Sequence, residues 1–270
     1  MASENISFGI EGDEWSYDRS NKTYDLTRGS SKKLTVGTTQ GPKDTSISIA
    51  PELSALVIVD MQNYFLSSRC RDPPHSLGLK AIGPTIRVIE KCREAGIQVI
   101  WLNWGLTPQD LRAMPAGVQR GFARDLISGT SGARNGLGGD LGDGMGRRLL
   151  AGSWNADIYA ALKPHVAPGD VHCAKNRMSG LWNEEQPLSR HLWSAGARTL
   201  LFTGVNTDQC VLGTLSNAYN AGWDCVLLED CCATTTEWGR EVCLHNIGNS
   251  YGFVTDSTKF VEGTISKVAI

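Results

Sequence analysis

Hydrophobic and polar positions follow two alternating periods along residues 51–270. The apolar run at residues 55–59 has the length and β-branched content of a strand buried on both faces of a sheet, and further strands are expected at residues 98–102, 171–175, 199–202 and 224–229. Segments with helical spacing lie after these runs, at residues 82–95, 158–162, 187–195, 210–221 and 237–247. Residues 251–257 can add a last strand. The alternation predicts an α/β protein, a three-layer αβα Rossmann-like fold with a mainly parallel central sheet of about six strands.

The first 50 residues precede this pattern, and we interpret residues 1–50 as an N-terminal arm. Residues 14–18 and 23–27 alternate apolar with polar side chains on either side of the turn-prone Ser20-Asn21-Lys22, which is typical of a β-hairpin. The aromatic side chains of this hairpin require a surface to cover, either on the chain's own body or on a second subunit. A terminal extension without fixed structure is the alternative.

Three polar side chains stand where strands of the body are expected to end. Asp60 follows the run 55–59, Lys175 ends the run 171–175, and Cys210 begins the helical segment after the run 199–202. In open α/β sheets the ligand crevice lies outside the carboxyl ends of the strands, so Asp60 and Cys210 should face the same crevice. A thiolate at a helix N-terminus is stabilised by unpaired N–H groups and the helix dipole. Each residue taken singly has an ordinary alternative. Asp60 can cap the following segment, Lys175 can be a solvated charge at a strand end, and Cys210 can be a buried core thiol.

Several motifs occur in order over residues 53–260. They are Val59-Asp60-Met61-Gln62 with Phe65, Lys175-Asn176-Arg177 with Ser179-Gly180, the stretch 204–211 around Cys210, and the stretch 228–234. In these motifs the chain resembles the isochorismatase-like cysteine hydrolase superfamily. That group contains nicotinamidases, N-carbamoylsarcosine amidases, ureidoacrylate amidohydrolases, biuret hydrolases and isochorismatases. Several separate motifs in one order make chance agreement improbable, and residues 51–270 are therefore interpreted as an isochorismatase-like hydrolase domain.

The resemblance implies a catalytic triad of Asp60, Lys175 and Cys210. Asp60 would take the thiol proton and return it to the departing nitrogen, while Lys175 would keep Asp60 ionised and favour the thiolate. In this family the oxyanion hole uses the backbone N–H of the nucleophile and of the residue four positions earlier, which follows a cis peptide bond. Here those residues are Cys210 and Asn206, with Val205-Asn206 as the expected cis bond.

Four further residues are candidate substrate contacts: Gln62, Trp104, Arg177 and Trp182. Arg177 can bind a carboxylate, although a surface ion pair is its ordinary alternative, and the two Trp are equally core residues. The glycine-rich residues 128–147 lack the Gly-Lys-Ser/Thr ending of a phosphate-binding loop. A long loop of this kind is typical of a lid over a binding site.

Composition and charge restrict the partners. A net charge of -2 with mixed signs argues against nucleic acid and anionic membranes, and the chain has no apolar run of about 18 residues. The N-terminus lacks the features of a signal peptide, so we expect a cytoplasmic protein acting on a small molecule. Family members are commonly oligomers, which implies a homo-oligomer, either a dimer or a tetramer.

The cysteines and histidines suggest neither disulfides nor a metal site. The 8 cysteines lie mostly in apolar helix and strand contexts, which favours reduced core thiols. Nicotinamidases of the family hold a metal through Asp and paired His residues after the second strand, where this chain has Asn103-Trp104-Gly105. The histidines show no ligand spacing elsewhere. We therefore expect no metal and no cofactor, and the departure argues against nicotinamide as substrate.

Three functions remain open at this point. The first is hydrolysis of a C–N bond in a small amide, ureide or carbamoyl compound through a thioester on Cys210. The second is isochorismate hydrolysis, a vinyl ether cleavage in which Asp60 donates a proton and no thiol is needed. The third is an inactive member that serves as a binding module, against which the complete triad argues. The presence of Cys210 favours the first.

Overall fold

The computed structural model describes residues 5–70, 76–128 and 136–267. Its centre is a six-stranded sheet in which every pairing is parallel, with strand order β11-β10-β9-β6-β7-β8. The strands are β6 Ser54–Val59, β7 Gln98–Trp104, β8 Val171–Lys175, β9 Thr199–Val205, β10 Asp224–Ala233 and β11 Phe253–Thr255. The predicted parallel sheet is confirmed, including its last strand. β6 and β9 are buried at every position, as expected for the middle of such a sheet.

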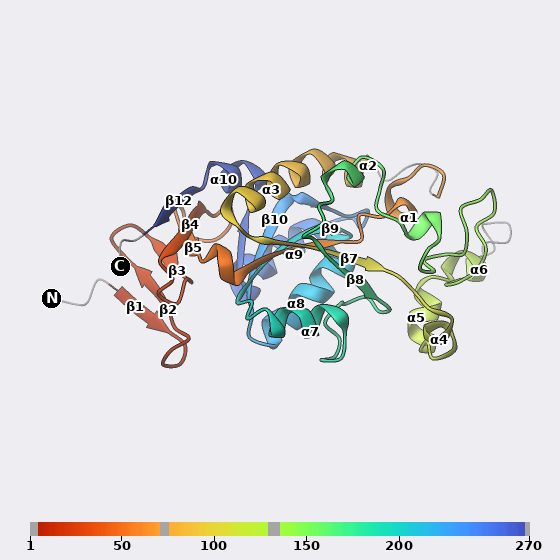
Figure 1. Ribbon diagram of the computed structural model, residues 1–270, viewed down its shortest axis with the longest axis horizontal. Coiled ribbons are helices and arrows are strands. Elements are labelled where there is room, and N and C mark those ends of the chain that lie inside the picture. Colours follow the sequence, from red (N-terminus) through yellow and green to blue (C-terminus); the bar gives the residue numbers. More distant parts are fainter. Residues whose placement is uncertain (1–4, 71–75, 129–135, 268–270) are drawn as a thin grey trace.

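Helices cover both faces of this sheet, which makes three layers (Figure 1). α2, α3 and α10 lie on one face, while α7 and α8 lie on the other. The helices on the sheet are α2 Ser76–Lys80, α3 Ile82–Ala95, α7 Pro187–Ser194, α8 Leu212–Asn220, α9 Gly239–Asn246 and α10 Ser257–Glu262. Short helices gather beyond the carboxyl ends of β6 and β7: α1 Asn63–Leu66, α4 Pro108–Arg112, α5 Ala116–Gly121 and α6 Arg124–Ser128. The predicted αβα architecture is thereby confirmed.

A second six-stranded sheet lies at the opposite end of the molecule (Figure 1), with strand order β1-β2-β3-β5-β4-β12. Its strands are β1 Asn5–Phe8, β2 Trp15–Asp18, β3 Thr23–Asp25, β4 Lys32–Gly37, β5 Ser46–Ile49 and β12 Thr264–Lys267. β2 and β3 pair as an antiparallel hairpin within this larger sheet. β12 joins it from the other end of the chain by pairing antiparallel with β4.

The aromatic side chains of the hairpin pack on the body of their own chain. The ring centroids of Trp15 and Tyr24 lie 5.6 Å and 5.2 Å from that of Phe253, the first residue of β11. The Trp15 indole N–H also donates to Asp224 Oδ1 at 2.9 Å. These contacts attach the N-terminal sheet to the amino end of β10 and to β11.

The helix predicted at residues 158–162 is wrong. Ile158 instead forms a strand-like bridge with Gln62, and the backbone N–H of Tyr159 donates to Met61 O at 2.9 Å. The N–H of Asn63 donates to Asp157 O at the same distance. The start of the segment is therefore extended, because it pairs with the backbone polar groups that follow β6, and the remainder forms a turn closed by the Leu162 N–H on Tyr159 O.

Within the described ranges, every helix is too short or too polar to cross a membrane.

Candidate active site

Asp60, Lys175 and Cys210 meet at the carboxyl ends of the central strands. Asp60 directly follows β6, and Lys175 is the last residue of β8. Cys210 lies in a π-helical turn, Thr207–Val211, between β9 and α8. Because β6 lies between β7 and β9, and β8 is next to β7, the parallel arrangement brings all three residues to one edge of the sheet.

The Lys175 ammonium is the centre of this cluster. Its Nζ lies 2.9 Å from Asp60 Oδ2 and 3.5 Å from Cys210 Sγ. It also donates to the Arg177 backbone carbonyl at 3.2 Å. Asp60, Lys175 and Cys210 are 0%, 1% and 4% exposed. A buried carboxylate and ammonium are therefore held in contact beside a buried thiol, where electrostatic interactions are stronger than in water.

Burial and charge act in opposite directions on the two acids of the cluster. Burial raises the pKa of Asp60, and the neighbouring Lys175 opposes this rise. Burial and the Asp60 carboxylate raise the pKa of Cys210 to about 12, against the lowering effects of Lys175 and the Trp104 side chain. Together these effects favour the protonated form of the thiol in the resting protein. A carboxylate with a raised pKa is a stronger base for that proton than an exposed one.

The turn before Cys210 requires glycine at position 204. Gly204 has a φ of 118°, and a Cβ there would lie 1.9 Å from the carbonyl oxygen of Val59 on β6. The close approach of β9 to β6 thus depends on the missing side chain. The next peptide bond, Val205-Asn206, is cis, as the family resemblance implied. Of the two expected oxyanion-hole residues, Asn206 directly precedes the π-helical turn and Cys210 lies within it.

Thr214 on α8 connects this turn to the loop after β8. Its hydroxyl donates to the backbone carbonyl of Cys210 at 2.7 Å and accepts from the N–H of Gly180 at 3.2 Å. Asp208, in the same turn as Cys210, accepts a hydrogen bond from the Thr234 hydroxyl at 2.5 Å. The turn that carries Cys210 is therefore fixed to the loop after β8 and to the end of β10.

Gln62, which we expected to contact substrate, serves a structural purpose. Its side chain is 0% exposed, and its amide nitrogen donates to Trp104 O at 2.7 Å and to Ala156 O at 2.5 Å. Its amide oxygen accepts from the Trp104 N–H at 3.1 Å. Both amide hydrogens are used within the protein, and these bonds hold the end of β7. Trp104, also 1% exposed, is packed beside Lys175.

Arg177 and Trp182 lie together at the rim of the cluster. The Arg177 guanidinium stacks over the Trp182 ring at 5.0 Å from the centroid, and the indole N–H donates to Asn176 Oδ1 at 3.1 Å. Trp182 is 41% exposed, so this pair lies at the surface. Met178 was missed by sequence reasoning. Its Sδ lies 3.4 Å from Cys210 Sγ although the residue is 42% exposed, so it separates the thiol from solvent.

The glycine-rich stretch at 128–147 is described only in part, because residues 129–135, where its lid role would be decided, lie outside the described residues. In the second half, the backbones of Asp140 and Arg147 pair in an isolated antiparallel β-bridge. Gly138 lies against α4, where an added Cβ would come within 2.5 Å of the Leu111 side chain. This half therefore contacts α4 at Gly138, while residues 142–144 are exposed.

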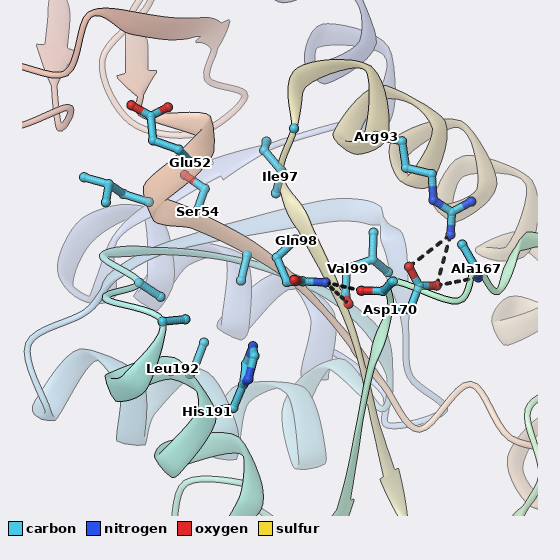
Figure 2. A pocket seen from close by; sticks show the side chains of 16 residues that line it. Glu52, Ser54, Arg93, Ile97, Gln98, Val99, Ala167, Asp170, His191 and Leu192 are labelled. Atoms are coloured by element: carbon cyan, nitrogen blue, oxygen red, sulfur yellow. Dashed lines mark hydrogen bonds and ion pairs between the residues drawn. The ribbon is translucent and has the colours of Figure 1, made fainter.

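A cavity of about 520 Å³ lies at the other end of the central sheet (Figure 2). It is lined by Ser54 and Gln98 at the amino ends of β6 and β7 and by His191 on α7. The Arg93 side chain at its edge is already paired with Asp170, with 3.0 Å between Nη2 and Oδ2. Its position at the amino ends of the strands separates it from Cys210, so it is not the reaction site. Among the residues that the structure describes, no three His, Cys, Asp or Glu side chains are grouped to hold a metal ion.

Comparison with known proteins agrees with this arrangement. The sequence matches the isochorismatase domain over residues 54–259. The chain belongs to the isochorismatase family. Ureidoacrylate amidohydrolase RutB from an Enterobacter species is 32% identical over 230 residues, covering 83% of this chain and 95% of the relative. RutB from Methylorubrum extorquens is 31% identical over 218 residues, covering 77% and 82%.

Solved structures of other proteins share the fold. A cysteine hydrolase from Pseudomonas syringae superimposes with a TM-score of 0.62 at 18% identity, covering 78% of this chain and 92% of that protein. N-carbamoylsarcosine amidase from Thermoplasma acidophilum has a TM-score of 0.55 at 23% identity, covering 76% and 96%. This isochorismatase-family chain is therefore a hydrolase built on the same αβα scaffold.

Proposed function

We propose that the protein hydrolyses a C–N bond of a small ureide or related amide through a thioester on Cys210. The observation that carries the proposal is the contact of three buried groups: Lys175 Nζ lies 2.9 Å from Asp60 Oδ2 and 3.5 Å from Cys210 Sγ. A protonated thiol needs a base within reach and a cation that favours the thiolate, and Asp60 and Lys175 supply them. The similarity to ureidoacrylate amidohydrolases favours a ureide among the possible substrates.

The proposed reaction has two halves. Asp60 accepts the Cys210 proton as sulfur attacks the substrate carbonyl carbon, and the backbone N–H groups of Asn206 and Cys210 stabilise the oxyanion. The C–N bond then breaks, and Asp60 returns the proton to the leaving nitrogen. Water attacks the thioester in the second half, giving its proton to Asp60 and releasing the acid product. The proton on Asp60 finally returns to the thiolate. Lys175 retains its charge throughout.

The test is a panel assay of ureides, carbamoyl compounds and simple amides with the parent protein and Cys210→Ala. We expect the variant to lose all measurable C–N hydrolysis while its melting temperature stays close to that of the parent, because a small buried thiol is replaced by a methyl group. Cys243→Ala is the matched control, since Cys243 is buried on α9 outside the cluster and its loss should preserve activity. Full amidase activity in Cys210→Ala would refute the thioester.

Isochorismate belongs in the same panel because its cleavage would need Asp60 and not Cys210. Vinyl ether hydrolysis requires only a proton donor, so Asp60→Asn would be inactive and Cys210→Ala active. In amide hydrolysis both residues act on one proton, so each single variant is severely impaired and the double variant is little worse. Turnover of isochorismate by Cys210→Ala at close to the parent rate would replace the amidase proposal.

A further inference from the structure

The Trp104 side chain lies directly against the Lys175 ammonium. Lys175 Nζ is 4.1 Å from the centroid of the indole ring, and both residues are 1% exposed. An ammonium over the face of an aromatic ring is attracted by the electron density of that face, and the attraction is stronger when the pair is removed from water. Trp offers the most favourable ring for this contact. The ring therefore stabilises Lys175 in its charged form and in one position.

The backbone of the same residue binds the other charge of the cluster. The Trp104 N–H donates to Asp60 Oδ1 at 3.2 Å and also to the Gln62 amide oxygen at 3.1 Å. Gln62 in turn donates to the Trp104 carbonyl at 2.7 Å, so its side chain holds both polar groups of one residue. An amide fully buried and fully hydrogen-bonded is fixed in orientation. Gln62 thereby fixes the residue that contacts Asp60 and Lys175.

The indole N–H of Trp104 is a third polar group close to the cluster. It is buried and has no hydrogen-bond partner among the described residues. Buried donors are rarely left unpaired unless the group has a use in another state of the protein. Burial and Asp60 raise the pKa of the Cys210 thiol, whereas Lys175 and the Trp104 side chain lower it. The indole N–H therefore makes no full hydrogen bond in the resting protein, yet it lies close enough to the sulfur to lower the pKa of the thiol, and it can donate to the thiolate once that charge has formed.

We propose that Trp104 is a positioning residue that prepares Cys210 for attack. Its ring holds the Lys175 ammonium, its backbone N–H holds the Asp60 carboxylate, and Gln62 fixes the Trp104 peptide that does both. This rests on the proposed function only in taking Cys210 as the nucleophile. It also replaces the expectation that Trp104 and Gln62 contact substrate.

Two other roles for Trp104 predict different results. A wall of the substrate pocket would change KM and substrate preference and leave the reactivity of the thiol toward a small reagent unchanged. A core residue would change the melting temperature alone. A positioning residue changes thiolate formation, which is measured by the pH dependence of Cys210 alkylation. The ionisable groups that face the thiol in that titration are Asp60 after β6 and Lys175 on β8.

The experiment compares Trp104→Phe and Trp104→Leu with the parent protein. Iodoacetamide alkylation of Cys210 is followed by peptide mapping from pH 6 to pH 10, with melting temperatures recorded for each variant. We expect Trp104→Leu to slow alkylation at pH 7 about tenfold, which corresponds to about one unit of pKa. Trp104→Phe keeps an aromatic face of weaker attraction, and we expect a loss of about threefold. With a ureide that the parent hydrolyses, kcat should fall in parallel while KM stays within about twofold.

Trp193→Leu is the control, because Trp193 is exposed on α7 and its ring packs against Trp223, away from the cluster. Its alkylation profile should match that of the parent. An unchanged profile in Trp104→Leu overturns the proposal, as does a raised KM with unchanged alkylation. If Trp104→Leu does not fold, Trp104→Phe decides: a parental rate overturns the proposal, and a slower one supports it. Alkylation requires no substrate, so this result stands even if the parent hydrolyses no ureide.

Discussion

An ion pair between Arg28 and Asp224 fastens the N-terminal sheet to the central sheet, and its removal should be costly. The guanidinium binds the carboxylate through two nitrogens, with Nη2 2.9 Å from Oδ1, and the side chains of Arg28 and Asp224 are 10% and 2% exposed. The carboxylate also accepts from Trp15 Nε1 and from the Thr199 hydroxyl, both at 2.9 Å. Asp224 begins β10, so the pair lies at the junction of the two sheets.

The size of the effect follows from leaving Asp224 without its cation. Breaking a buried pair by removing one partner costs about 3 to 5 kcal/mol, because the remaining charge stays buried. Two neutral donors remain on the carboxylate, so we expect about 3 kcal/mol for Arg28→Met, or a melting temperature lower by about 6 to 9 °C for a chain of this size. Burial already raises the pKa of Asp224, and Arg28 opposes that rise. Without Arg28 the carboxyl group titrates at still higher pH.

The loss of stability in Arg28→Met should therefore depend on pH. A group with a raised folded pKa contributes stability that is present below its unfolded pKa and is lost as the pH rises through the folded value. The deficit of Arg28→Met should therefore shrink as the pH is lowered from 7 toward 4. Melting temperatures by circular dichroism measure both effects, and Arg28→Met combined with Asp224→Asn should recover part of the loss.

Arg190 and Glu185 provide the control pair, since their side chains are 66% and 73% exposed. Exposed pairs contribute little to stability, so Arg190→Met should melt with the parent protein. A melting temperature for Arg28→Met within about 2 °C of the parent, under the 6 to 9 °C expected, would refute the reasoning. So would a double variant no more stable than the single one.

Three further outcomes are expected. Met178→Ala should speed iodoacetamide alkylation of Cys210 several-fold, because the Met178 thioether covers the Cys210 sulfur on the side that faces solvent. An unchanged rate would show that another group covers the sulfur. Gly204→Ala should lower the free energy of unfolding by about 3 kcal/mol or more in urea titrations, because its Cβ meets the β6 backbone; a parental midpoint would contradict this. Stability should fall as the pH rises above about 8.5, the ordinary thiol pKa, because burial raises the pKa of several folded thiols; a constant urea midpoint between pH 7 and 10 would contradict it. These thiols are Cys92, Cys173, Cys225, Cys231 and Cys232.

The central sheet was predictable from sequence because its strands carry their signal locally. Runs such as 55–59 and 199–202 are apolar at nearly every position, and such runs are buried on both faces wherever the chain turns next. Parallel strands place Asp60 and Cys210 at one edge of the sheet, since their carboxyl ends share it, whereas the inclusion of Lys175 in the same cluster was implied by the family resemblance. These features needed no knowledge of side-chain packing.

The features that were missed depend on partners far apart in the chain. Residues 158–162 have helical spacing, but their backbone groups pair with the chain after β6. The sequences of β4 and β5 carry little of the apolar patterning that predicts a strand. The two strands pair with each other, and β4 also pairs with β12. Gln62 in a family motif suggests a ligand contact, yet its amide is consumed by Trp104 and Ala156. Met178 has an ordinary loop context, and only the folded chain reveals its contact with the nucleophile.

The pairing of β12 with β4 has a consequence for synthesis on the ribosome. β4 is complete at Gly37, whereas β12 begins at Thr264, so one side of β4 remains without its neighbour until almost all of the described chain has been made. During that interval β4 presents unpaired N–H and C=O groups to other nascent chains, as any open strand does. Lys32 and Lys33 at its start add charge, which discourages such pairing. The N-terminal sheet is thus completed, by the pairing of β12 with β4, only late in synthesis.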